Sequence, residues 1–314
     1  METDHARSPD HGGSSRSLKA HILLVLMTLI WGSTFVLIKT ALLSASPLLF
    51  NAVRMSLAAI LLTLFYRRHL SRITRPALWA GVNAGIFLFL GYAFQTTGLR
   101  LTTASKSAFL TGISTVLVPL LLILIWKAHI NPWRAVGIVT AFVGLFFMTV
   151  PPGRQGIADF ANVNRGDLFS VACAVGFAFQ IIFIGRASQR FPFHQMAVLQ
   201  MSTAALLTAI ASPVLEQPHL QLSATVVTAI LVTGILGTAV AFTVQAWAQQ
   251  FTPATHAALI FTLEPVFAWL TSFVVLNERL GGRAGAGALL ILAGVLVSEL
   301  LGNVARPERA LAEG

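Results

Sequence analysis

The chain has 314 residues, of which 56% are hydrophobic and only 10% are charged, against about 25% charged residues in a typical soluble domain. With a mean hydropathy of +0.78, it carries too few charged side chains to cover a soluble protein of this size. Its 22 phenylalanines and long aliphatic runs are the opposite of a disordered composition. The single cysteine, Cys173, excludes an intrachain disulfide and a cysteine metal cluster.

Ten apolar runs are separated by short polar segments. A helix needs about 20 apolar residues to cross a hydrocarbon core of about 30 Å. The runs are 20–41, 46–66, 76–97, 104–126, 132–150, 166–186, 193–215, 222–246, 256–276 and 283–302. They are continuously apolar rather than alternating, which argues against β-barrel spans. The sequence therefore predicts an all-α integral membrane protein with ten transmembrane helices.

The distribution of Lys and Arg predicts the orientation. If the N-terminus is cytoplasmic, 13 of these residues lie on the cytoplasmic side and 7 outside, and basic residues are enriched in cytoplasmic segments. We therefore expect a multi-pass protein of the cytoplasmic (inner) membrane with both termini inside, 1–19 and 303–314 being polar cytoplasmic tails. The net charge of +10 is then explained by topology, and no nucleic-acid partner is expected.

The two halves of the chain show a weak internal similarity. An offset of 150 residues places Gly137 on Gly287 and Gly144 on Gly294. Because each half contains an odd number of spans, the second half is inverted relative to the first. The predicted organisation is one five-span repeat over 20–150, an external linker over 151–165 and a second five-span repeat over 166–302. Inverted repeats place substrates near the bilayer midplane, between the halves.

Motifs in both halves resemble the EamA domain. The first half contains Trp-Gly-Ser-Thr-Phe at 31–35, followed by Lys39, Pro47 and Arg54. The second half contains Leu-Glu-Pro-Val-Phe at 263–267 and Asn-Glu-Arg-Leu at 277–280, followed by several glycines. Over residues 20–302 their order and spacing are similar to two EamA domains of the drug/metabolite transporter (DMT) superfamily. The resemblance implies ten helices in two inverted five-helix repeats, and transport of small metabolites such as amino acids, often outward.

Arg54 and Glu264 are the ionisable residues predicted to lie deepest in the membrane. Each lies about eight residues into its run, or about 12 Å at 1.5 Å per residue, which is near the midplane. We expect Arg54 to bind a substrate carboxylate through its planar guanidinium. Glu264 is expected to bind an ammonium group or to carry a proton. The alternative is a structural ion pair between the two.

Further candidates for the substrate site surround these two residues. Trp31 and Phe35 would form an aromatic wall, and Pro265 is expected to interrupt the ninth helix because it lacks a backbone donor. Asn83 and Gln180 are the neutral polar residues expected to line a cavity, with interhelical hydrogen bonding as the alternative.

Three basic residues lie near the ends of the predicted spans. His256 is a second candidate for proton coupling, with a plain interfacial role as the alternative. Lys39 and Lys106 are expected to extend to the membrane interface, with a role as an outer gate as the alternative.

These patterns favour a secondary transporter over other classes. The chain has no Gly-x-x-x-x-Gly-Lys phosphate loop, and no paired carboxylates or nucleophile motif for an enzyme. We predict a non-ATP exporter of small polar metabolites such as amino acids, which works by alternating access at a midplane site. Its expected partners are a small-molecule substrate and the lipid bilayer, as a monomer or homodimer, without cofactor or metal. The alternatives are a channel or non-transporting membrane interaction protein, and, less favoured, an intramembrane enzyme.

Overall fold

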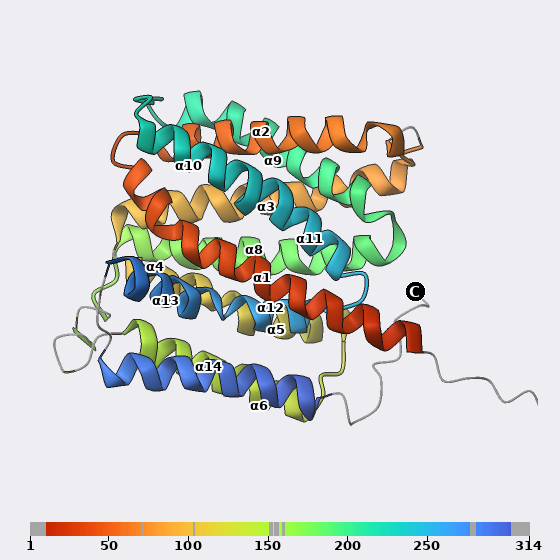
Figure 1. The fold of residues 1–314 in the computed structure, drawn as a ribbon, viewed down its shortest axis with the longest axis vertical. Coiled ribbons are helices and arrows are strands. Elements are labelled where there is room, and N and C mark those ends of the chain that lie inside the picture. The colour runs from red at the N-terminus through yellow and green to blue at the C-terminus, as the bar shows by residue number, and fades with distance from the viewer. Residues whose placement is uncertain are drawn as a thin grey trace, which may run out of the picture.

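The structure, a computed structural model, describes residues 11–70, 72–102, 104–150, 153, 157–158, 161–276 and 281–302. The regular elements in these residues are helices, and ten helical spans among them are long and apolar enough to cross a membrane. This confirms the predicted all-α fold with ten spans. Figure 1 shows the spans side by side, with α6 and α14 at one edge of the bundle and α2, α9 and α10 at the other.

The first half of the chain forms five spans. They are α1 (His11–Ala41), α2 (Pro47–Tyr66), α3 (Arg75–Leu101), α4 (Ala104–Gly112) with α5 (Ser114–Trp126), and α6 (Pro132–Thr149). A short 3₁₀ helix, η1 (Arg67–His69), follows α2. Pro47 and Pro132 open their helices, where a missing backbone N–H is harmless. The side chain of Asn131 caps α6 by accepting a hydrogen bond from the Trp133 amide at 2.9 Å.

The second half forms the remaining five spans. They are α8 (Arg165–Arg190), α9 (Phe193–Leu215), α10 (Ala224–Gly234) with the π-helix η2 (Ile235–Val240) and α11 (Ala241–Ala248), α12 (Ala254–Phe261) with α13 (Glu264–Leu276), and α14 (Gly282–Leu300). Asn164 and Asp167 form a capping box at the start of α8, in which each side chain accepts a hydrogen bond from the other residue's amide.

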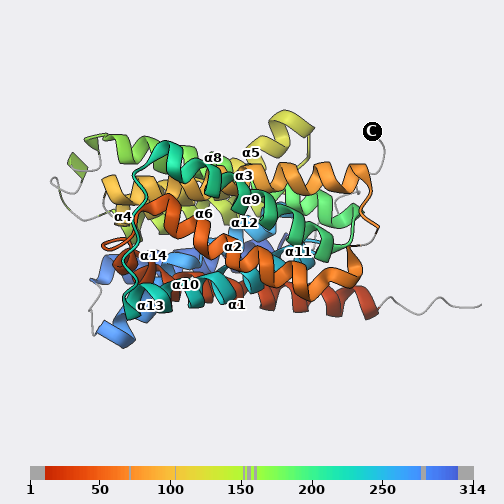
Figure 2. The same ribbon diagram turned by 90° about the horizontal axis from the view of Figure 1, so that it is seen from above.

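The two halves repeat each other in element bounds and in packing. The helix α5 begins 150 residues before α13, and α6 begins 150 residues before α14. The first span of each half packs on the third span of the other, α1 on α10 and α11 and α8 on α3, while α2 packs on α9 and α6 on α14. Figure 2 shows α5 and α8 on one face and their equivalents α13 and α1 on the opposite face. Two inverted five-helix halves produce this exchange.

Four glycines form a reciprocal contact between α6 and α14. A Cβ atom on Gly137 would lie 2.5 Å from the carbonyl oxygen of Gly294, and one on Gly294 would lie 2.5 Å from that of Gly137. Gly144 and Gly287 face each other in the same way, at 2.6 Å in both directions. Because Gly137 is equivalent to Gly287 and Gly144 to Gly294, this is the self-complementary contact of a two-fold axis. Small residues here let the two backbones approach.

The terminal segments and the linker differ from the prediction or lie outside the described residues. The first helix begins at His11, so residues 11–19 continue α1 instead of belonging to a tail. No proline separates this segment from the apolar run that follows it, so the helix can extend through it. Residues 1–10, 303–314 and the 277–280 motif lie outside the described part, as do residues 151–152, 154–156 and 159–160 of the predicted linker.

The glycine contact predicts that Gly287→Ala lowers the melting temperature of the purified protein by several degrees, because overpacking costs about 1–3 kcal/mol. Gly285→Ala, on the same helix, is the matched control, since a Cβ atom there meets nothing within 4 Å. Thermal unfolding of both variants in one detergent measures the difference. Equal melting temperatures would show that the α6–α14 contact is looser than described.

Candidate functional site

The ninth span is interrupted directly before Glu264. The helix α12 ends at Phe261, α13 begins at Glu264, and Thr262 and Leu263 form a turn between them. Pro265 has no amide hydrogen to donate to the carbonyl of Phe261, four residues earlier, so a continuous helix would lose a hydrogen bond here. The predicted interruption at Pro265 is confirmed.

The fourth span is interrupted at the equivalent place. The helix α4 ends at Gly112 and α5 begins at Ser114, which lies 150 residues before Glu264. The hydroxyl of Thr115, the next residue, donates a hydrogen bond to the carbonyl of Ala258 in α12 at 3.2 Å. The two broken spans therefore meet in the bundle, with a carboxylate in the second half where the first half has a hydroxyl. Ser114 was not predicted from the sequence, although the 150-residue offset from Glu264 points to it.

The Trp-Gly-Ser-Thr-Phe segment of α1 packs against this interruption. A Cβ atom on Gly32 would lie 2.7 Å from the carbonyl oxygen of Glu264 and from the amide nitrogen of Ala268, so only glycine permits this approach. The indole Nε1 of Trp31 donates a hydrogen bond to the carbonyl of Gly237 in the π-helix η2 at 2.8 Å. The indole ring also contacts the ring of Phe261, with centroids 5.3 Å apart.

A cavity of about 550 Å³ lies between the two halves. It is lined by residues from α1, α2, α3, the two broken spans, α6, α8 and the span of α10, η2 and α11. Five of the predicted site residues contribute to its lining: Trp31, Arg54, Gln180, Glu264 and Pro265.

The cavity occupies one half of the bundle along the span direction. On α1 its lining begins at Trp31, on α3 at Tyr92 and on α6 at Leu145, and it continues toward the C-terminal end of each of these helices. The residues in the first halves of α1, α3 and α6 do not contribute to it. In the predicted orientation, the cavity therefore extends from the midplane toward the outside.

Arg54 is a buried cation surrounded by aromatic rings. Its side chain is 3% exposed, and its guanidinium carbon lies 4.4 Å from the ring centroid of Tyr92 and 5.8 Å from that of Phe50. Such cation–π contacts stabilise a cation but do not neutralise its charge. No ion pair joins Arg54 to any carboxylate in the described part of the chain, and its Nε atom is buried without a hydrogen-bond partner.

Glu264 supplies the carboxylate of the cavity wall. It is half-buried and lines the cavity, and no described Lys, Arg or His forms an ion pair with it. The structural ion pair between Arg54 and Glu264, considered as an alternative from the sequence, is thus not formed among these residues. Tyr92 lies close enough to interact electrostatically with both groups.

Three glutamines form a buried network at the side of the cavity. The amide nitrogen of Gln180 donates hydrogen bonds to Gln200 at 3.0 Å and to Gln245 at 3.2 Å. Gln180 and Gln245 also line the cavity. Gln180 therefore combines the two roles that the sequence left open, since it joins α8, α9 and α11 and also faces the cavity. Gln245 was not recognised as a site residue from the sequence.

Other predicted site residues lie elsewhere. Asn83 is exposed on α3 and does not line the cavity, because it precedes Tyr92 by nine residues, about two and a half helical turns, and so faces the opposite side. His256 is buried at the start of α12 and also does not line the cavity. Phe35 lies on α1 one turn after Trp31, but its side chain is outside the described part of the structure.

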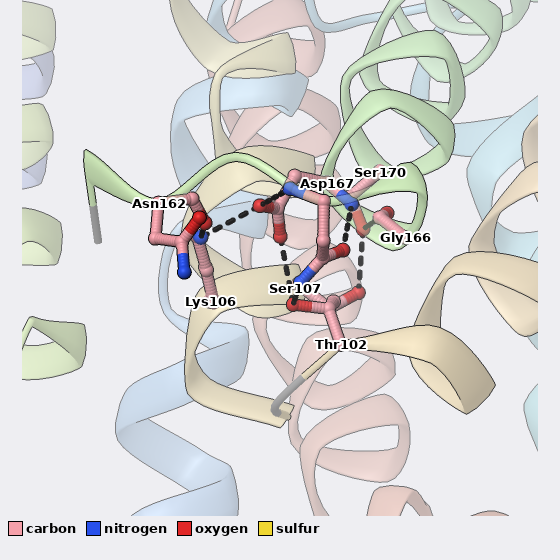
Figure 3. Close-up of polar contacts among 8 residues, drawn as sticks. Thr102, Lys106, Ser107, Asn162, Gly166, Asp167 and Ser170 are labelled. Carbon is pink, nitrogen blue, oxygen red and sulfur yellow. Dashed lines mark hydrogen bonds and ion pairs between the residues drawn. The ribbon is translucent and has the colours of Figure 1, made fainter. Parts of the chain in front are cut away.

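Lys106 forms an ion pair instead of extending to the interface. It is buried, and its Nζ lies 2.6 Å from Oδ2 of Asp167 and donates a hydrogen bond to the carbonyl of Asn162 at 2.7 Å. Thr102 donates a hydrogen bond to the other oxygen of Asp167 at 2.7 Å. Figure 3 shows Lys106 of α4 and Asp167 at the start of α8 together with Thr102, directly after α3, and Asn162, before α8. The expected snorkelling of Lys106 is therefore wrong, because Asp167, which lies 61 positions later, supplies a counter-charge.

This ion pair adjoins the cavity. Ser107, next to Lys106, lines the cavity and accepts a hydrogen bond from Ser170 at 3.0 Å. Lys39 is exposed and also contributes to the lining. The end of the cavity that lies near the predicted outer surface is thus bordered by two basic residues, one of them paired.

Comparison with known proteins gives consistent matches. The profile of the EamA-like transporter family matches residues 18–150 and 164–300. An "Uncharacterized transporter" from Archaeoglobus fulgidus is 34% identical over 288 residues, covering 91% of this chain and 87% of the relative. An S-adenosylmethionine/S-adenosylhomocysteine transporter from Chlamydia muridarum is 35% identical over 98 residues, covering 30% of this chain and 31% of that protein. A crystal structure at 18% identity superposes with a TM-score of 0.73 over 90% of this chain and 99% of its own, which shows a shared fold.

The position of the cavity predicts one-sided labelling. The native Cys173 is fully buried, so the background reaction is expected to be low. Ala108→Cys places a thiol on the cavity wall, and we expect a membrane-impermeant thiol reagent to modify it from the outside of intact cells. Ala174→Cys, at a fully buried position of α8, is the control and should not react. Labelling of Ala108→Cys only from the cytoplasmic side would contradict the predicted orientation of the bundle.

Proposed function

Because the chain belongs to the EamA-like transporter family, as its motifs predict, we propose that this membrane transporter exports small polar metabolites of the amino acid class through its central cavity. The substrate would carry both a carboxylate and an ammonium group. The observation that carries the proposal is that one cavity exposes a cation, Arg54, and an anion, Glu264, which are not paired with each other.

The charges of the cavity support a zwitterionic substrate. A buried charge in a membrane span is costly, by about 2.5–3.5 kcal/mol on insertion scales. A substrate carboxylate beside Arg54 and a substrate ammonium beside Glu264 would lower this cost for both groups. The guanidinium of Arg54 offers a planar pair of donors that matches a carboxylate, and the carboxylate of Glu264 accepts hydrogen bonds from an ammonium group.

The size and the remaining walls of the cavity support a small substrate. Ligand pockets are typically about 300–1,000 Å³, and the cavity here is about 550 Å³. Trp31, Phe177 and Phe242 supply apolar wall for a side chain, whereas Gln180 and Gln245 supply amide groups. This mixture suits a molecule with a charged head and a partly apolar side chain.

One relative supports the same substrate class. The 98-residue match is to a transporter of S-adenosylmethionine and S-adenosylhomocysteine, and both of these compounds contain an α-amino acid group. The outward direction rests on the resemblance to the family, whose members often export. Because a single chain lines the cavity, a monomer is sufficient for transport in this proposal.

Alternating access would use the interruptions of the fourth and ninth spans. The segments α4 and α12 lie on opposite sides of the two interruptions, at opposite ends of the bundle, as the inverted repeat requires. Separation of α4 from α8 would break the Lys106–Asp167 ion pair and would widen the outer end of the cavity. Closure there and opening at the other end would complete the cycle. Glu264, at the interruption, is placed to exchange a substrate ammonium for a proton.

Flux into proteoliposomes tests the proposal. Labelled amino acids, nucleobases and small amines would be offered to the purified protein, with and without an imposed pH gradient. We expect saturable flux of amino acids, and a loss of at least about tenfold, or about 1.4 kcal/mol, in Arg54→Gln and in Glu264→Gln. Asn83→Ala is the matched control, because Asn83 is exposed away from the cavity, and should transport like the wild type.

Three results would count against parts of the assignment. Normal flux through well-folded Arg54→Gln would remove Arg54 from the substrate site. Saturable flux that ignores the pH gradient, in both the wild type and Glu264→Gln, would remove the proton from the cycle and leave Glu264 with substrate binding alone. Flux of amines or nucleobases but not of amino acids would contradict the zwitterionic substrate.

A further inference from the structure

Three metal-ligating side chains meet at the end of the bundle opposite the cavity. His21 comes from α1, His256 from the first turn of α12 and Glu299 from the last turn of α14. One donor atom from each lies within 4.8 Å of the other two. None of the three lines the cavity, so the transport proposal gives the cluster no role.

The distances in the cluster are close to those between ligands around one metal ion. Nδ1 of His21 lies 3.3 Å from Oε2 of Glu299, and Nδ1 of His256 lies 3.0 Å from Oε1. A tetrahedral ion with bonds of about 2.0–2.2 Å holds its ligand atoms about 3.3–3.6 Å apart. The centroids of the two imidazole rings lie 5.8 Å apart, and one ligand atom from each ring lies within 4.8 Å of the other.

The His256 ring contacts the carboxylate of Glu299 through one nitrogen only. Its Nδ1 lies 3.0 Å from Oε1 of Glu299, whereas its Nε2 is buried without a hydrogen-bond partner. The Nε2 atom of His21 is also buried without a partner. Buried polar atoms without partners are rare, and they call for an explanation such as an ion.

The ligand types and the neighbouring charge determine which metal ion is preferred and how tightly it binds. Two imidazole nitrogens and one carboxylate form a ligand set used for Zn²⁺, with a fourth position left for water. Such nitrogen donors favour Zn²⁺, Co²⁺ or Ni²⁺ over Mg²⁺ and Ca²⁺, which prefer oxygen ligands. Arg134 on α6 also interacts electrostatically with Glu299, and its positive charge would weaken the binding of a cation.

We propose that His21, His256 and Glu299 form a binding site for a divalent transition-metal ion of the Zn²⁺ class. The sequence predicted no metal site, because these residues lie at positions 21, 256 and 299 and only the fold brings them together. A bound ion would tie α1 and α14 to α12, the segment of the broken ninth span that lies away from the cavity. It would therefore hold this end of the bundle closed and slow transport. The site itself does not depend on the identity of the substrate.

Zinc titration of the detergent-solubilised protein tests the site. The full chain, carrying an affinity tag without histidine and stripped by a chelator, would be titrated calorimetrically with Zn²⁺ alone, and then with Mg²⁺. Co²⁺ would be the spectroscopic probe, because tetrahedral Co²⁺ absorbs visible light much more strongly than the hydrated ion. We expect one Zn²⁺ per chain, no saturable binding of Mg²⁺, and a tetrahedral Co²⁺ spectrum.

The variants separate this cluster from other histidines. His21→Ala, His256→Ala and the nearly isosteric Glu299→Gln should each raise the Kd for Zn²⁺ by at least about tenfold and abolish the tetrahedral Co²⁺ bands. His194→Ala is the matched control, because the His194 ring lies at a partly exposed position, with its centroid 4.6 Å from that of His69, and this variant should bind Zn²⁺ like the wild type. His5→Ala/His11→Ala tests the N-terminal histidines in the same way.

The outcomes decide the proposal without reference to transport. Loss of binding in Glu299→Gln that elutes as a monodisperse protein, with retention in the two control variants, would establish the site. Absence of saturable Zn²⁺ binding to the wild type would overturn it. Wild-type binding that survives all three cluster substitutions, or that disappears with the N-terminal pair, would also overturn it.

Discussion

The interruptions of two membrane-spanning helices determine where this structure can hold a polar cavity. A broken backbone exposes carbonyl and amide groups, which lipid cannot satisfy, so interruptions are tolerated only inside the protein or beside a water-filled cavity. The fourth and ninth spans are both broken, at Ile113 and at Thr262–Leu263, and both breaks lie beside the central cavity. Gly32 brings α1 against the second break, and Thr115 of α5 donates a hydrogen bond to a carbonyl of α12. The cavity, the bundle symmetry and the placement of Glu264 all follow from these two breaks.

The two repeats share the same arrangement of helices, but equivalent positions in them carry different polar side chains. Equivalent positions carry Ser114 and Glu264 beside the breaks, and Lys106 and His256 near opposite ends of the bundle. The glycines of α6 and α14 instead stay identical across the repeat, because both helices must come equally close at one axis. Packing across the axis thus preserves symmetry, whereas in the described residues the cavity gains the carboxylate of Glu264 from the second half alone. A site with one cation and one anion can orient a zwitterion, which a symmetric site with two like groups cannot do.

The sequence was most informative about features that concern the backbone. The apolar runs are long enough to define ten spans, and Pro265 alone predicts the break before it because it removes a hydrogen-bond donor. Arg54 and Glu264 were found because charges are rare in membrane spans. Side-chain direction was harder, since a span that is apolar on all faces does not reveal which side faces a cavity. Asn83 was therefore predicted to line the cavity but lies on the outer surface, and Gln245 and Ser114 were missed. Lys106 was misinterpreted because its partner, Asp167, belongs to another span.

The two ends of the bundle are held by different polar contacts. At the end near the cavity, Lys106 and Asp167 form a buried ion pair with further hydrogen bonds to Asn162 and Thr102. Breaking one partner of such a pair leaves a buried charge, so this contact favours two discrete states, joined or fully separated and solvated. At the opposite end, the equivalent position is His256, which meets another histidine and a carboxylate. Imidazole and carboxylate groups can both ligate a metal ion, so in our proposal this contact binds a cation. Equivalent backbone positions of the two repeats therefore carry different polar contacts, a lysine–aspartate ion pair at one end and a histidine–carboxylate cluster at the other, so the two ends of an inverted repeat need not open under the same conditions.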